Sequence, residues 1–184
     1  MQAPLNERPT LMNDFTTSVT INRPVEDVFK AVLDARGWWN EAIDGPTAEV
    51  GDEFGFEVPG LHRTRMRITD VEHDRRIIWL VVDNFFAFVE DQSEWVGDRI
   101  QFDIAAEGDG ARVTFTQHGL VPDLECYDVC SNAWVFFVRE SLRRLAEDGE
   151  GMPESSAGQA APASRARSAV DALTARSGSA EPSS

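Results

Sequence analysis

The chain has 184 residues, 42% of them hydrophobic, and a formal net charge of −15 at pH 7. Such an acidic surface repels phosphate groups, which disfavours binding to nucleic acids and anionic membranes. The longest apolar run, residues 77–89, contains Asp83 and is too short to cross a bilayer, and no charged-then-apolar leader opens the chain, so we expect a cytoplasmic protein.

Composition divides the chain into one domain and two flanking segments. Residues 1–13 show no hydrophobic periodicity and are expected to be flexible, and residues 153–184 consist mostly of Ala, Ser, Pro and Gly. A segment with so few large apolar side chains cannot bury enough surface to offset its ordering entropy, so we predict a disordered tail. Residues 14–152 remain as one domain, a size that buries roughly two thirds of the unfolded chain's surface.

A strand and an amphipathic helix open this domain. Residues 14–21 alternate apolar and polar side chains, which predicts a half-buried strand. In the helix that follows, Asn22 is placed to cap the first turn and Pro24 suits an early helical position. The helix should end near Gly37.

Two consecutive tryptophans follow, Trp38 and Trp39, in a segment predicted to be a short helix or turn. We expect them to point in different directions, so that one packs inward and the other lines an entrance. The alternative is a simple lid over the core, because aromatic side chains dominate ordinary packing energetics.

Through the middle of the chain, apolar and polar residues then alternate with a period of two. The turn signals EHDRR and EGDG join neighbouring strands as hairpins. Arg63, Arg65 and Arg67 should lie on the solvated face, opposite Met66 and its apolar neighbours. The predicted strands are residues 51–58, 63–71, 75–83, 98–107 and 111–118.

Residues 84–95 connect two of these strands and carry Phe85, Phe86 and Phe88. Three phenylalanines in a connection are unfavourable in water, so we expect them to cover the mouth of a cavity. An exposed patch that supports a homodimer is the rival interpretation.

A long helix is predicted over residues 123–148, capped at its start by Asp123, with a wide apolar face. Cys126 and Cys130 lie on it one turn apart, a geometry that rarely closes a disulfide. The spacing fits no established zinc pattern, and free cysteine is often buried as a small apolar group. We therefore interpret both as core or pocket wall, and predict no metal and no cofactor.

The order of elements indicates an α+β fold. A curved antiparallel sheet with one apolar face must be covered, and only the terminal helix is long enough to cover it. This is the helix-grip layout, in which a sheet wraps around a long C-terminal helix and commonly leaves a cavity between them.

Several sequence segments carry a family resemblance: RPVEDVFKAV, GWW and VGDEF, then IIWLVVDN, EWVGDRIQFDI and FTQHGLVPDLECYDVCSNAW. Together they resemble the SRPBCC (START-like) superfamily, and within it homologues of the C-terminal domain of the Hsp90 ATPase activator. The resemblance covers residues 14–152 and none of the tail. It implies a hydrophobic cavity for a lipid-like or polyketide-like molecule.

One departure from the family pattern concerns the last strand, which in relatives commonly reads Thr-His-x-Gly. Here the inward position two residues beyond Phe115 is Gln117, and His118 should point the other way. Glutamine forms hydrogen bonds but does not titrate, which argues against a general base at this position.

The candidate ligand contacts follow from this layout. Polar candidates are Gln117, Tyr127, Asn132, Ser141 and His62, each of which could equally satisfy a buried backbone group. The predicted ligand-binding residues are Trp38, Trp39, Met66, Trp79, Phe85, Phe88, Gln117, Tyr127, Cys130 and Trp134.

Three functions remain open at this stage. The first is binding of an apolar small molecule, with no catalytic residue assigned. The second is an enzyme of the cyclase or aromatase type, with Tyr127 or His62 moving a proton. The third is a protein-interaction module of the chaperone-activator type, whose acidic face meets a basic partner.

Overall fold

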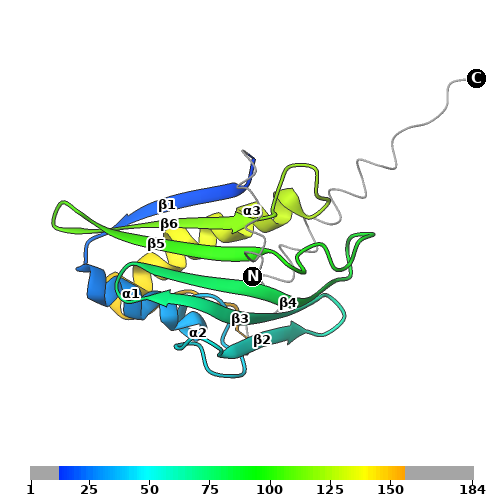
Figure 1. Ribbon diagram of the computed structural model, residues 1–184, viewed down its shortest axis with the longest axis horizontal. Helices are drawn as coiled ribbons and strands as arrows, with labels where there is room; N and C mark the ends of the chain where they lie inside the picture. Colours follow the sequence, from blue (N-terminus) through cyan, green and yellow to red (C-terminus); the bar gives the residue numbers. More distant parts are fainter. Residues whose placement is uncertain (1–12, 156–184) are drawn as a thin grey trace, which may run out of the picture.

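The computed structural model describes residues 13–155. Its six strands form one antiparallel sheet in the order β1-β6-β5-β4-β3-β2. The first strand therefore pairs with the last and closes one edge of the sheet, as Figure 1 shows. The strands are β1 (Phe15–Ile21), β2 (Glu53–Val58), β3 (His62–Glu72), β4 (Arg76–Phe86), β5 (Arg99–Glu107) and β6 (Gly110–His118).

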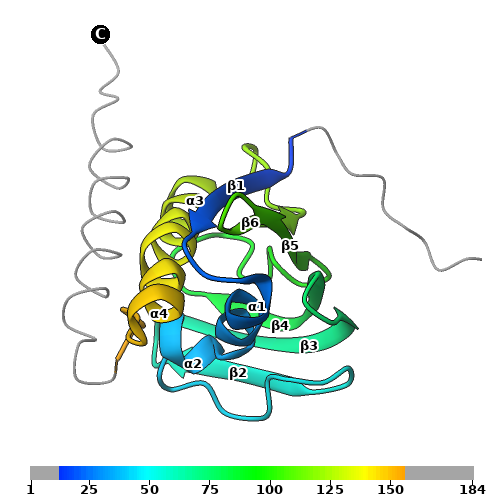
Figure 2. The same ribbon diagram turned by 90° about the vertical axis from the view of Figure 1, so that its left-hand side faces the viewer.

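The helices lie on one face of this curved sheet (Figure 2). Two short helices, α1 (Val25–Leu33) and α2 (Ala35–Trp38), follow β1. The C-terminal helix runs without a break through α3 (Tyr127–Phe136), the π-helical segment η1 (Phe137–Leu142) and α4 (Arg143–Asp148). The α+β helix-grip arrangement predicted from the sequence is confirmed. Within the described range, no helix is long and apolar enough to cross a membrane.

Alternation along the strands sorts side chains between the two faces. On β3, Thr64, Met66 and Ile68 are buried beneath the helices. The intervening Arg63 and Arg67 lie on the outer face, where they pair with Asp83 and Glu53 at 2.8 Å and 2.5 Å. The predicted solvated arginine row is confirmed.

A β-bulge interrupts this alternation on β4. Arg65 pairs with Asp83 and Met66 pairs with Val81, so Val82 is an extra residue. Such an insertion resets which side chains point inward. Val81 and Asn84 are therefore both buried on the concave face, although they are three positions apart in the sequence.

The C-terminal helix begins at Tyr127, four residues later than predicted, because residues 122–126 form turns. The Glu94 carboxylate accepts hydrogen bonds from the backbone N–H groups of Glu125 and Cys126, at 3.0 Å and 3.2 Å. An acid from another part of the chain thus takes the role that was predicted for Asp123.

The first helix also differs from its prediction. Pro24 occupies the N-cap position, and the Asn22 backbone N–H instead donates to Glu147 of α4 at 2.9 Å. The helix ends at Leu33, because the side chain of Asp34 caps the separate α2 by accepting from the Gly37 N–H.

The fold continues beyond the C-terminal helix. Glu154 forms an isolated parallel bridge with Asn40, and its backbone N–H donates to the Trp39 carbonyl at 2.9 Å. Residues 153–155 therefore pack beside α2, past the boundary predicted at residue 152. The remainder of the predicted tail and residues 1–12 lie outside the described residues.

Candidate functional site

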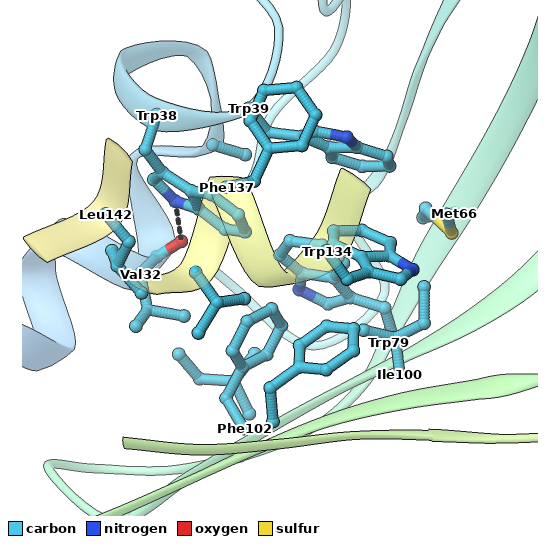
Figure 3. Close-up of a cluster of buried hydrophobic side chains, with 14 of the residues drawn as sticks. Val32, Trp38, Trp39, Met66, Trp79, Ile100, Phe102, Trp134, Phe137 and Leu142 are labelled. Atoms are coloured by element: carbon cyan, nitrogen blue, oxygen red, sulfur yellow. Dashed lines mark hydrogen bonds between the residues drawn. The ribbon is translucent and has the colours of Figure 1, made fainter. Parts of the chain in front are cut away.

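An aromatic cluster fills much of the space between the sheet and the C-terminal helix (Figure 3). The ring centroids of Trp38 and Trp39 lie 6.2 Å and 5.8 Å from that of Trp79, with interplanar angles of 19° and 16°. Trp134 of α3 lies 5.0 Å from Trp39. Met66 of β3 is buried at the edge of the same cluster.

Trp38 and Trp39 both point inward, so the prediction that they diverge is wrong. Their exposed fractions are 0% and 4%. The backbone of Trp39 is still in the right-handed helical region, with φ −104° and ψ −64°. Successive side chains on a helical turn are separated by about 100°, and here both directions meet apolar surface, one toward β4 and the other toward Phe56 and α3.

Hydrogen bonds anchor the α2 side of the cluster. The Trp38 indole N–H donates to the Val32 carbonyl at 3.2 Å. The Ser141 hydroxyl donates to the Trp38 carbonyl at 2.7 Å and accepts from the Met152 N–H at 2.7 Å. Ser141, a candidate for ligand contact, is thus engaged by the protein's own backbone.

Gln117 is buried on the concave face and holds Trp134 in place. Its amide oxygen accepts from the Trp134 indole N–H at 2.8 Å, and its amide nitrogen donates to the buried Asp98 carboxylate at 2.9 Å. As predicted, His118 points the other way, where its ring lies 3.0 Å from Asp14 and 3.1 Å from Gln101. The amide of Gln117 therefore positions an aromatic ring.

The residues on α3 separate into inner and outer groups. Cys126 and Cys130 are buried, and burial raises the pKa of the Cys130 thiol, an effect reinforced by Cys126 and Glu94 and opposed in part by Trp95. A protonated, enclosed thiol is a wall residue rather than a nucleophile. Tyr127 is half-buried against Phe15 at the β1 edge, with ring centroids 6.4 Å apart. Asn132 is exposed, so the structure does not bring it to the interior.

The phenylalanine segment is arranged differently from its prediction, because β4 continues to Phe86. Phe85 lies on the outer face, with the Arg63 guanidinium 5.6 Å from its ring centre. Phe86 points inward, and its ring lies 5.0 Å from both Phe88 and Trp95. The structure thus groups Phe88 with the inner face and leaves Phe85 outside it.

The connection between β4 and β5 closes over this inner group. Its Glu94 binds the N–H groups that precede α3, as described above, and Glu125 accepts from the Glu90 N–H at 3.2 Å and 3.3 Å. Hydrogen bonds from backbone N–H groups to the Glu94 and Glu125 carboxylates thus hold this connection, called the cover, at its outer side. Its Trp95 side chain points inward and is buried.

Under the cover lie three polar side chains that sequence reasoning did not bring together: His62, Asn84 and Trp95. Within residues 13–155, the His62 Nε2, both amide atoms of Asn84 and the Trp95 indole nitrogen are buried with no partner at hydrogen-bond distance and angle. The Asn84 amide still acts on the pKa of His62, and Trp95 on that of Cys130. Burial lowers the pKa of His62 to about 4, and the Asn84 amide opposes this only in part. Asn84 escaped prediction because only the bulge turns it inward.

No cluster of three or more potential metal ligands occurs among the described residues. The site therefore combines an aromatic wall, a fastened cover and a small group of unpaired polar atoms. Neutral hydrogen bonding and apolar contact are the interactions that this set of groups offers.

Comparisons with known proteins agree with this architecture. The family model described as Activator of Hsp90 ATPase homolog 1-like protein matches residues 22–147. No curated protein matches the sequence significantly.

Solved structures share the fold at low sequence identity. The solution structure of the Aha1 dimer from Colwellia psychrerythraea has a TM-score of 0.61 and 20% identity, covering 76% of this chain and 100% of that one. A Bacillus halodurans protein has a TM-score of 0.55 and 21% identity, over 75% and 99% of the two chains. DynU16, from the dynemicin biosynthetic locus, has a TM-score of 0.55 and 16% identity, over 77% of this chain and 49% of its own.

Proposed function

The chain belongs to the Activator of Hsp90 ATPase homolog 1-like protein family, and from this membership and the interior described above we propose that it binds an apolar small molecule. The ligand, of lipid or polyketide type, would lie between the concave face of the sheet and the C-terminal helix. Affinity would come mainly from apolar surface removed from water, at about 25 cal/mol per Å² before the costs of binding.

The observation that carries this proposal is the pairing of aromatic surface with unpaired polar atoms on one buried face. Interiors that serve stability alone pair nearly all of their buried polar groups. Binding pockets, in contrast, hold a few convergent polar groups in an apolar lining. The Asn84 amide, enclosed with neither atom paired in the described part of the chain, fits the second pattern.

The proposed lining follows from the packing. Trp39, Trp79 and Trp134 would contact the body of the ligand, and Gln117 would support it indirectly by fixing Trp134. Trp38, Met66, Phe88 and Cys130 complete the wall, whereas Tyr127 would contribute only from the β1 edge. Access would require the β4–β5 connection to move, which would break its carboxylate–backbone hydrogen bonds and lift the buried Trp95 and Val89 out of the interior.

A cyclase-type reaction is a second candidate, favoured by one observation. His62 presents a buried, unpaired ring nitrogen on the concave face, where it could accept a proton. Its pKa of about 4 makes it a weak base at neutral pH, which is why binding is the better-supported function.

The surface of the described residues gives less support to a protein-interaction role. Only Val50 and Val96 are large hydrophobic side chains with high exposure in this part of the chain. A homodimer or a chaperone contact would therefore have to rely on the acidic polar surface.

The proposal predicts saturable binding of the neutral fluorescent probe N-phenyl-1-naphthylamine, with a rise in probe emission and a loss of tryptophan emission. Two adjacent residues on opposite faces provide the matched test. Phe86→Leu alters the inner face and should change probe affinity at least several-fold, whereas Phe85→Leu alters the outer face and should leave it within about twofold.

Two results would count against the proposal. One is the absence of saturable binding by the wild-type protein. The other is an equal effect of Phe85→Leu and Phe86→Leu, which would mean that the probe does not distinguish the inner face from the outer one.

A further inference from the structure

The His62, Asn84 and Trp95 side chains, together called the polar end, form one group. Asn84 and Trp95 are each 4% exposed. The His62 ring centroid lies 5.7 Å from that of Trp95, and the planes of the two rings meet at 88°. Thr64 pairs with Asn84 across β3 and β4, and His62 pairs with Phe86, so His62 and Asn84 are diagonal neighbours on the same face.

The polar end continues into the aromatic cluster. Trp95 stacks on Trp134 with centroids 5.9 Å apart and an interplanar angle of 18°. Phe56 links His62 to Trp39, at 5.1 Å and 5.0 Å respectively. The polar end therefore packs directly against the aromatic cluster.

Unpaired buried polar atoms are costly, and this fold pairs them elsewhere. Gln117 carries the same amide group on the same concave face, and both of its amide atoms are hydrogen bonded. Five described residues have buried side-chain atoms without a partner. Three of the five make up the polar end, and a fourth, Trp79, points from β4 into the adjacent cluster. Buried polar groups without a partner in the chain take one from outside it, a ligand or a bound water.

The chemistry of the polar end determines what such a ligand carries. Trp95 and the Asn84 nitrogen donate, and the Asn84 oxygen accepts, while the His62 Nε2 donates or accepts according to its tautomer. A ketone or hydroxyl oxygen satisfies donors of this kind, and a hydroxyl proton satisfies the acceptor.

The charged groups around the polar end favour a neutral ligand over an anion. Among the described residues, no Lys or Arg is buried. Arg63 and Arg65 of β3 face outward and pair with Asp83 and Asp44. Glu94 of the cover is a negative group that already acts on Cys130. A carboxylate at the polar end would lose its hydration and meet no Lys or Arg, and its one cationic partner would be a protonated His62, which burial disfavours.

We propose that the polar end selects a neutral oxygen-bearing group, a ketone or hydroxyl, on an otherwise apolar ligand, and discriminates against carboxylates. This inference rests on the proposed function, because it specifies which class of apolar molecule the interior takes.

The test uses three naphthalenes of matched shape that displace N-phenyl-1-naphthylamine from the full-length protein. They are 2-acetylnaphthalene, 2-isopropenylnaphthalene and 2-naphthoate, whose substituents are built on a trigonal carbon with the same number of heavy atoms and differ mainly in polarity and charge. The ketone should bind about tenfold more tightly than the hydrocarbon, and the carboxylate more weakly than either at neutral pH.

Two variants assign this preference to the polar end. Asn84→Leu removes the amide, and Trp95→Phe removes one N–H while keeping an aromatic ring. Each should reduce the preference for the ketone to less than about threefold while the hydrocarbon still binds. Phe85→Leu, on the outer face, should retain the full preference.

The outcomes separate the two proposals. Equal wild-type affinity for ketone and hydrocarbon, or tighter binding of the carboxylate, would overturn the assignment and leave apolar binding intact. Failure of all three compounds and of the probe to bind would overturn both. A preference unchanged in both variants would also overturn the assignment.

Discussion

Replacing Gln117 with leucine should lower the free energy of unfolding by about 3 kcal/mol, a fall in Tm of roughly 6–12 °C. The substitution leaves the buried Trp134 indole N–H without its acceptor and takes one donor from the buried Asp98 carboxylate. Unpaired buried groups cost about 1–3 kcal/mol each, and more where one is charged. Urea unfolding followed by circular dichroism measures the difference.

Asn84→Leu is the matched control, since it also replaces a buried amide on the concave face. Because neither Asn84 amide atom has a partner at hydrogen-bond geometry within the described residues, and its polar influence is on His62, its removal should cost far less stability than that of Gln117. If Asn84→Leu cost as much as Gln117→Leu, Asn84 would have to be paired in solution, and the distinction between the two amides would fail.

Acidification should destabilise the protein through His62 by up to about 3 kcal/mol. The pKa of His62 is lowered from 6.5 to about 4 in the folded state, with burial as the main cause. Between these two pH values the unfolded state binds a proton that the folded state excludes. The free energy of unfolding is therefore undiminished by His62 above pH 6.5, and it decreases as the pH falls from 6.5 toward 4.

The His62→Gln variant isolates this contribution, because glutamine is polar but does not titrate. The free energy of unfolding, measured at intervals from pH 4 to pH 7.5, should fall more steeply in the wild type than in the variant. Parallel curves would show that the His62 ring is accessible to water in the folded protein, and the enclosed polar end would have to be abandoned.

The sheet and the terminal helix could be predicted from the sequence because their signals are local. A period of two identifies the strands, and the apolar face of the last helix identifies what covers them. Family motifs such as VGDEF and the segment from Phe115 to Trp134 added confirmation at the level of the fold. The inward Gln117 and the outward His118 follow from alternation alone.

The site could be predicted only in part, because two of its determinants are not local. The bulge at Val82 depends on the pairing of β3 with β4, and it decides that Asn84 and Phe86 face inward while Phe85 faces outward. The start of α3 depends on Glu94, about thirty residues earlier in the chain. Trp38 and Trp39 could both be buried because two different elements receive them.

If a ligand is held against the inner aromatic wall, the indole N–H groups of the five tryptophans will report on it directly. In nitrogen-15 NMR spectra, titration with 2-acetylnaphthalene should move the Trp95 and Trp79 signals and give contacts between the ligand and the Met66 methyl group. The Trp38 signal should move least, since its N–H is already bonded to Val32. Ligand contacts confined to outer-face residues such as Phe85, with the inner indole signals unmoved, would contradict binding between the sheet and the C-terminal helix.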